Sequence, residues 1–144
     1  MRSKRAFTLV EILIVVIILG ILAALVVPQF TGATQEAASK STVSQLSKIR
    51  NAIGVFYVRN GNTWPNITAG DGTWGEVITV GGEYMKTPPA NKWVSPAYST
   101  TIILRDTPDT EYTLPSPTYG WIYSPTRNEV WAAGFDEFDN PFPR

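Results

Sequence analysis

The first pattern in the chain is a run of apolar residues from Phe7 to Val27, twenty-one residues long and interrupted by one charge, Glu11, and one hydroxyl, Thr8. A helix of that length rises about 30 Å, which is enough to cross the hydrocarbon core of a bilayer. The run is therefore predicted to be a membrane helix. A secretory signal peptide is the alternative, but the run is longer than the usual apolar core of such peptides, and a carboxylate is out of place in one.

A second pattern follows from Gln29 to Arg59, where Ala, Ser, Thr, Gln and Lys are mixed with spaced apolar residues. The apolar positions recur at steps of three and four, which predicts one face of an amphipathic helix. These positions are Val43, Leu46, Ile49, Ile53, Phe56 and Tyr57. Asn60-Gly61 is a helix stop signal. One helix from Phe7 to Arg59, with a disturbance at Pro28, would be about 80 Å long.

Beyond Gly61 the chain is rich in Gly, Pro, Thr and Trp, and residues 62–98 are predicted to be loop with a short helical turn. Four strand-like runs follow, and the last two flank a five-residue connection, residues 124–128, that suits a hairpin. By side-chain alternation Trp121 and Tyr123 share one face, and Val130 and Ala132 share a face opposite Trp131, so one side of the hairpin is expected to pack on the helix. The runs are Thr100–Leu104, Glu111–Leu114, Tyr119–Tyr123 and Glu129–Ala133.

The predicted fold is thus α+β, a long N-terminal helix packed on a small C-terminal antiparallel β-sheet. At 144 residues the chain has room for one modest domain. It contains no His and no Cys, which removes the commonest general base and metal ligand, disulfides and thiolate chemistry. An enzyme is not expected, because no carboxylate pair stands in a context suited to catalysis. The net charge is zero and the basic residues beyond the N-terminus are scattered, which gives no support for nucleic-acid binding.

The N-terminus carries the most specific motif: Lys4-Arg5-Ala6-Phe7-Thr8-Leu9-Val10-Glu11, followed by the apolar helix. It resembles the class III signal of type IV pilins and type II secretion pseudopilins, and the layout is most similar to the major pseudopilins. The resemblance implies that a membrane-bound prepilin peptidase cuts between Ala6 and Phe7 and methylates the new amine of Phe7. The family usually has Gly before the cut, whereas this chain has Ala6, which is still a small residue.

The resemblance also implies a division of the chain and a set of partners. The division is a leader at 1–6, a transmembrane and assembly helix at 7–28, its amphipathic continuation at 29–60, and a small loop-rich β domain at 61–144. The implied partners are other copies in a homopolymeric filament, the prepilin peptidase, an inner-membrane assembly platform and minor pilin-like subunits. Basic residues on the N-terminal side of the apolar run place the N-terminus in the cytoplasm. The expected location is the bacterial inner membrane as a single-pass protein, then a periplasmic or cell-surface filament.

Glu11 and Pro28 are the expected assembly residues. An ionised carboxylate in hydrocarbon costs several kcal/mol unless it is paired or neutralised. Cleavage would create a positive amine on Phe7 at nearly the same depth, so Glu11 of one subunit is expected to pair with the amine of a neighbour. A kink or unwinding at Pro28 would let the helix bend or stretch in a filament. The plainer alternatives are an interfacial Glu and a membrane-helix boundary at Pro28.

The chain ends in an acidic segment with Asp136, Glu137 and Asp139. The related pseudopilins lack a C-terminal disulfide and often fix this loop with a bound calcium ion. Calcium takes six to eight oxygen ligands, which carboxylates and backbone carbonyls of such a loop could supply. A solvated acidic tail is the alternative.

Two further questions stay open at the level of sequence. The five Trp residues could form a stacking surface for sugars or bases, although in a small Cys-free domain they are more often core residues. The chain could also be a bitopic protein that uses its apolar helix only to anchor an extracytoplasmic ligand-binding domain. Such an anchor would keep Met1 to Ala6, whereas a filament subunit would begin at Phe7.

Overall fold

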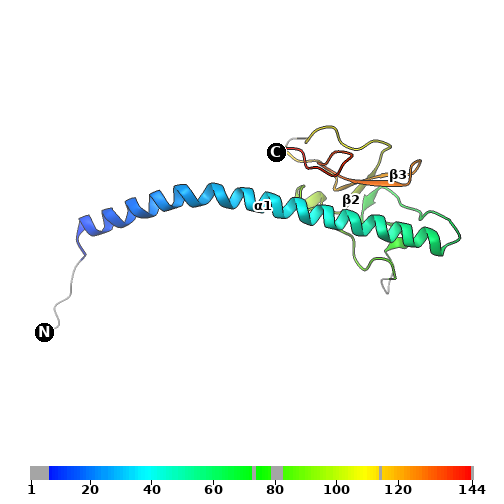
Figure 1. Ribbon diagram of the computed structural model, residues 1–144, viewed down its shortest axis with the longest axis horizontal. Helices are drawn as coiled ribbons and strands as arrows, with labels where there is room; N and C mark the ends of the chain where they lie inside the picture. The colour runs from blue at the N-terminus through cyan, green and yellow to red at the C-terminus, as the bar shows by residue number, and fades with distance from the viewer. Residues whose placement is uncertain (1–6, 73, 79–82, 114, 144) are drawn as a thin grey trace. The chain divides into compact units, whose positions relative to one another are not determined.

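A computed structural model describes residues 7–72, 74–78, 83–113 and 115–143, without the side chains of residues 27–31 and 71. The chain separates into two compact units, Met1–Glu36 and Ala37–Arg144. The helix α1, Leu9–Arg59, contributes residues to both (Figure 1). The predicted boundaries of the leader and of the three following segments remain predictions, and residues 1–6 and the side chain of Pro28 lie outside the described part.

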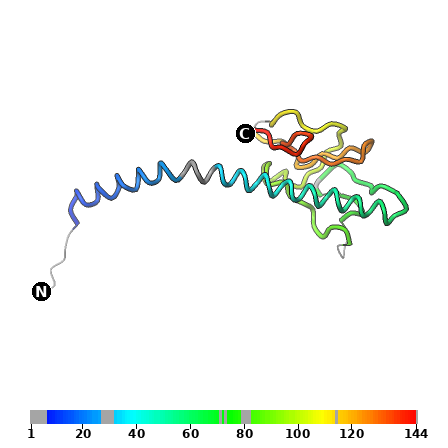
Figure 2. Tube along the Cα trace, viewed as in Figure 1, coloured from blue at the N-terminus to red at the C-terminus, as the bar shows by residue number. Residues whose placement is uncertain are grey.

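The described part of the first unit is the N-terminal portion of α1, drawn in blue in Figure 2. Every side chain from Phe7 to Val26 is exposed, and residues Leu9–Val26 have a mean hydropathy of 3.2, long and apolar enough to cross a membrane. Fully covering one Leu, Ile, Val or Phe side chain is worth about 1.5–3 kcal/mol. This segment gains none of that stabilisation from its own chain, so its apolar surface requires lipid or another molecule.

In the second unit α1 presents the predicted amphipathic face. Its buried side chains join the core, and the helix ends at Arg59 as the Asn60-Gly61 signal predicts. Gly61 has a φ of +63°, the left-handed conformation that Gly adopts without strain. The backbone N–H of Asn62 then donates to the carbonyl of Tyr57 (2.9 Å) and closes the last turn. The buried residues on this face are Leu46, Ile49, Ala52, Ile53 and Phe56.

The sheet of the second unit has four strands in the order β1, β2, β3, β4. The strands are β1 Gly70–Asp71, β2 Thr101–Leu104, β3 Trp121–Ser124 and β4 Glu129–Ala132, and two 3₁₀ turns lie at Gly75–Val77 and Pro96–Tyr98. The strands predicted at 100–104, 119–123 and 129–133 and the hairpin between the last two are confirmed. The short β1 strand was missed, because two residues show no periodic pattern.

One side of the hairpin packs on the helix, as expected, and the structure identifies which side. Trp121 pairs with Ala132 and Tyr123 with Val130, and all four side chains belong to the same core cluster as the buried face of α1. Ile122 and Trp131 alternate to the other face of the hairpin, where they are also buried. Trp64 is 41% exposed and stacks on Tyr57, with ring centroids 4.1 Å apart. The other four Trp residues are buried, so the core interpretation holds for them.

The α+β, pilin-like fold class is confirmed, but the expectation of a purely antiparallel sheet is wrong at one pair. Strands β2 and β3 run parallel, which requires a crossover connection between them. The crossover is closed by the buried carboxylate of Asp109, which accepts bonds from the Arg105 guanidinium, the Tyr119 hydroxyl (2.7 Å) and the Gly134 N–H (2.8 Å). Arg105 and Tyr119 lie near the two ends of the crossover, so this network returns the chain to the edge where β3 begins.

The strand predicted at Glu111–Leu114 is also wrong over residues 111–113, and Leu114 lies outside the described residues. This segment belongs to the crossover between β2 and β3, where it is held by a side chain rather than by a ladder of backbone bonds. Tyr112 packs on the core, and its hydroxyl lies 3.5 Å from the carbonyl of Trp93. The alternation of polar and apolar residues at 111–113 therefore does not mark a strand. It arises because the ring of Tyr112 packs on the core.

A buried amide joins the helix to the sheet. The side chain of Asn91, which is 0% exposed, donates from Nδ2 to the carbonyls of Gly120 (2.8 Å) and Ala133 (3.0 Å). Its Oδ1 accepts from the N–H of Trp93 (2.8 Å) and from the hydroxyl of Thr42 on α1 (3.1 Å). Both donors and both acceptor positions of the amide are thus used.

Asn91→Ala is expected to lower the free energy of unfolding by about 3 kcal/mol, because it removes four hydrogen bonds from a buried position and leaves polar groups unsatisfied. Denaturant titration followed by tryptophan fluorescence measures the change. Asn51→Ala, at an exposed position of α1, is the matched control and should stay within about 0.5 kcal/mol of wild type. Equal stability of the two variants would contradict the role of Asn91.

Candidate functional site

The N-terminal end of α1 is fixed by a reciprocal pair of side chains. The backbone N–H and the hydroxyl of Thr8 both lie 2.8 Å from Oε2 of Glu11, and the N–H of Glu11 donates to the Thr8 hydroxyl oxygen (3.2 Å). This is a capping box, in which the residue before the helix and the third helical residue satisfy each other's backbone donors. Glu11 therefore has a fixed place at the end of the apolar helix before any other molecule is present.

Sequence reasoning missed Thr8 as a functional residue and noted only its hydroxyl. The signal was present, because Thr8-Leu9-Val10-Glu11 has the spacing of a capping box directly before an apolar helix. The bonds found from Thr8 to the carboxylate end on Oε2, and among the described residues no hydrogen bond ends on Oε1. The carboxylate thus has an oxygen that can accept a bond from another molecule.

The structure places the other predicted assembly residues only in part. Phe7 lies directly before the capping box with 82% of its surface exposed, and among the described residues no bond joins it to Glu11 of the same chain. Ala6 lies outside the described residues, whereas the backbone at Pro28 is helical and lies within α1.

The acidic C-terminal segment forms a compact turn around Asp136. Its Oδ1 accepts the backbone N–H groups of Phe138 (2.9 Å) and Asn140 (2.8 Å), and its Oδ2 accepts the side-chain amide of Asn140 (3.1 Å). The hydrogen bond from the Asn140 backbone, with further bonds from the Asn140 amide and Phe138, lowers the pKa of the Asp136 carboxyl below its ordinary value of 3.8. Asp136 acts here as an acceptor of its own loop's donors.

The three predicted calcium ligands are not brought together. Asp139 is paired with Arg50 on α1, and Glu137 lines a cavity beside it. Among the residues that the structure describes, no group of three or more carboxylates is placed to hold a metal ion. The calcium interpretation of this segment is thus without a ready set of carboxylate ligands among the described residues.

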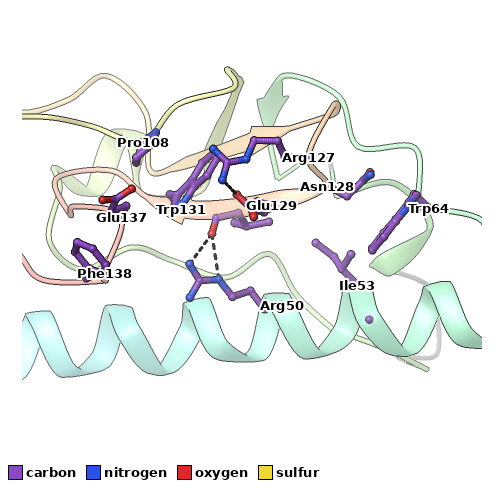
Figure 3. Close-up of a pocket in the computed structure, with 12 residues that line it drawn as sticks. Arg50, Ile53, Trp64, Pro108, Arg127, Asn128, Glu129, Trp131, Glu137 and Phe138 are labelled. Carbon is purple, nitrogen blue, oxygen red and sulfur yellow. Dashed lines mark hydrogen bonds and ion pairs between the residues drawn. The ribbon is translucent and has the colours of Figure 1, made fainter.

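The cavity beside Glu137 has a volume of about 470 Å³ and lies between α1, the hairpin and Trp64 (Figure 3). Both of the Arg side chains that line it are already paired, Arg50 with Asp139 and Arg127 with Glu129. A ligand site usually offers a few convergent polar groups that can bind the ligand. The cavity thus gives little support to the alternative of a ligand-binding domain on a membrane anchor.

Comparison with known proteins gives matches of two kinds. A family model described as the prokaryotic N-terminal methylation motif matches residues 1–27. The type II secretion system core protein G of Aeromonas hydrophila is 32% identical over 103 residues, which cover 66% of this chain and 71% of that protein. The protein of the same name from Klebsiella pneumoniae is 40% identical over 60 residues, which cover 42% of this chain and 43% of that protein.

A fimbrial protein of Pseudomonas aeruginosa is 40% identical over 52 residues, which cover 36% of this chain and 34% of that protein. The chain thus spans less than half the length of the Klebsiella and Pseudomonas relatives in these matches. No solved structure matches.

The lowered pKa of Asp136 predicts an acid-sensitive C-terminal loop. A carboxyl with a lowered pKa in the folded state contributes stability above its unfolded pKa, and loses it as the pH falls through the folded value. The contribution of Asp136 should therefore be complete above about pH 4 to 5, begin to fall near its ordinary pKa of 3.8, and be lost once the pH passes below the lower pKa of the folded state. Melting temperatures measured across this range should show that Asp136→Asn melts lower than wild type at neutral pH and that the difference shrinks in acid. Glu137→Gln, at an exposed neighbouring carboxylate, is the control; a constant difference for Asp136→Asn at every pH would refute the prediction.

Proposed function

The chain belongs to the type II secretion system core protein G family, and we propose that it works as a structural subunit of a pseudopilus-type filament, polymerised through the exposed apolar part of α1. Members of this family are structural proteins, so the chain is not an enzyme. The observation that carries the proposal is the exposed apolar helix, Leu9–Val26, whose first turn carries one capped carboxylate. The apolar surface of such a helix can be covered either by the lipid of a membrane or by the helices of other subunits.

Processing comes first in the proposed sequence of events. Prepilin peptidase cuts between Ala6 and Phe7 and methylates the new amine. The match of residues 1–27 to the methylation motif supports this step. Before assembly the subunit lies in the bacterial inner membrane as a single-pass protein with its N-terminus in the cytoplasm, since the basic residues Arg2, Lys4 and Arg5 precede the helix.

Assembly then pairs Glu11 of one subunit with the Phe7 amine of a neighbour. The capping box supports a division of the carboxylate, in which Oε2 holds the subunit's own helix end and Oε1 accepts the amine. An apolar helix bundle has no intrinsic axial register, because one turn of Leu, Ile and Val resembles the next. A single charge pair at a defined depth supplies that register, and an unpaired charge there costs several kcal/mol.

The remaining partners follow from the same proposal. An inner-membrane assembly platform extracts the subunits, and minor pilin-like subunits join the same filament. Pro28 lies inside the range of α1, and its missing backbone donor allows the helix to bend or unwind when subunits pack. The filament is then periplasmic or exposed on the cell surface.

The mature protein is expected to begin at methylated Phe7. Mass spectrometry of the membrane-extracted protein should give a mass lower by Met1 to Ala6 and higher by one methyl group. A catalytically inactive prepilin peptidase in the same cells is the control and should leave the full-length mass. Detection of an intact Met1 in cells with active peptidase would favour the membrane-anchor alternative.

Glu11→Ala is expected to abolish or sharply reduce filament assembly while membrane insertion stays intact. On insertion scales, removal of an acidic residue at the centre of a membrane helix favours insertion by roughly 2.5–3.5 kcal/mol, and less near its end. Assembly suffers because the Phe7 amine loses its partner. Electron microscopy of sheared filaments beside a membrane-fraction blot measures the two effects.

Two further variants separate the charge from the cap. Glu11→Asp keeps the charge but shortens the reach, so an intermediate filament yield is expected. Thr8→Val removes the hydroxyl that holds the carboxylate but leaves the charge, so it should reduce assembly less than Glu11→Ala does. A wild-type filament yield from Glu11→Ala would remove the central claim of the mechanism.

A further inference from the structure

The last loop of the chain, Gly134 to Phe142, is closed by its own backbone. The N–H of Asp136 donates to the carbonyl of Asn140 (2.9 Å), and the N–H of Phe142 donates to the carbonyl of Gly134 (2.9 Å). These bonds shape the loop, but none of them ties it to the helix. The start of the loop is held by the buried ring of Phe135 and by the bond from the Gly134 N–H to Asp109, and a further contact holds the part around Asp139.

That contact is the guanidinium of Arg50. From α1 it donates through Nε (3.1 Å) and Nη2 (2.8 Å) to the carbonyl of Val130 in β4, as Figure 3 shows. It also donates through Nη1 (2.6 Å) and Nη2 (3.0 Å) to the two carboxylate oxygens of Asp139. The rigid fork of Arg suits such a two-pronged bond to a carboxylate. One side chain thus joins the helix, the last strand and the C-terminal loop.

The backbone at Asp139 is consistent with a constrained position. Asp139 has a φ of +65°, a left-handed conformation that is uncommon outside Gly and that Asp adopts more readily than most residues. Its N–H donates to the carbonyl of Asp136 (3.2 Å). The tight turn presents the carboxylate to Arg50, and the ion pair in turn holds the turn.

We infer that Arg50 takes the place of a structural calcium ion in this protein, and that its C-terminal loop is closed without a divalent cation. A calcium ion requires six to eight oxygens directed at one point. Here both oxygens of Asp139 and the carbonyl of Val130 accept N–H groups of a positively charged guanidinium. A cation at these oxygens would have to displace Arg50.

The turn around Asp136 points the same way. Its carboxylate is surrounded by the N–H groups of Phe138 and Asn140, which are donors and would face a cation with their positive ends. The carboxylates of Asp136 and Asp139, two of the three predicted calcium ligands, are therefore already satisfied by donors of the chain itself. This inference goes beyond the proposed filament function, because it concerns the fold of a single subunit and can fail or succeed independently of assembly.

The test uses the full-length protein in a non-ionic detergent, with the melting temperature read from tryptophan fluorescence. Wild type should melt at the same temperature in millimolar calcium and in EDTA, since a ligand that binds only the folded state would raise the melting temperature. Asp139→Asn and Arg50→Met should each lower it by several degrees. The double variant should melt no lower than the less stable of the two single variants, which is the behaviour of two residues that act as one pair.

Two comparisons sharpen the result. Arg50→Lys keeps the charge but cannot bond both Asp139 and Val130 in the same way, so it should melt between wild type and Arg50→Met. Glu83→Gln breaks the exposed ion pair with Arg59 and should leave the melting temperature almost unchanged. The inference is overturned if calcium raises and EDTA lowers the melting temperature of wild type, or if Asp139→Asn and Arg50→Met both melt with wild type.

Discussion

The helix α1 has to satisfy two different surroundings within one continuous element, and the rest of the structure follows from this constraint. From Leu9 to Val26 its side chains are exposed and, apart from Glu11, apolar, whereas from Leu46 to Phe56 the apolar residues form one face that is buried under the sheet. The first part is not buried by any of the described residues, so its apolar surface must be covered by lipid or by other subunits. The second part must be held firmly enough that the domain keeps its fold in either surrounding.

The second part of α1 is joined to the sheet by polar as well as hydrophobic contacts. A hydrophobic face alone can slide along a helix, but the Asn91 amide bonds Thr42 on α1 and the carbonyls of Gly120 and Ala133 at one fixed position. Arg50 adds a second fixed point on the same helix through Val130 and Asp139. Buried polar groups that are fully satisfied rigidify a core and specify one arrangement. The sheet is therefore pinned to α1 at two places along its length.

The sequence allowed the helix, its end at Arg59 and the hairpin to be predicted, because each has a local signal: a period of 3.6, a Gly in left-handed conformation, and alternation around a turn. The parallel pairing of β2 with β3 had no local signal, since it depends on Asp109 meeting Arg105, Tyr119 and Gly134 across the crossover. Glu11 could be found by its charge in an apolar run. The partners of Asp136 and Asp139 could not, because an acidic tail gives no indication of which donors will face it.

Three carboxylates that hold the folded domain together are satisfied more fully by their own chain than the carboxylate proposed for assembly. Both oxygens of Asp109, Asp136 and Asp139 accept bonds from donors within the folded domain. Removing such a bond destabilises the subunit itself. Glu11 is held at Oε2 by Thr8, and no bond between described residues ends on its Oε1. A group that is oriented but only half satisfied can exchange surroundings without unfolding anything, which is what a subunit needs when it leaves a membrane and enters a filament.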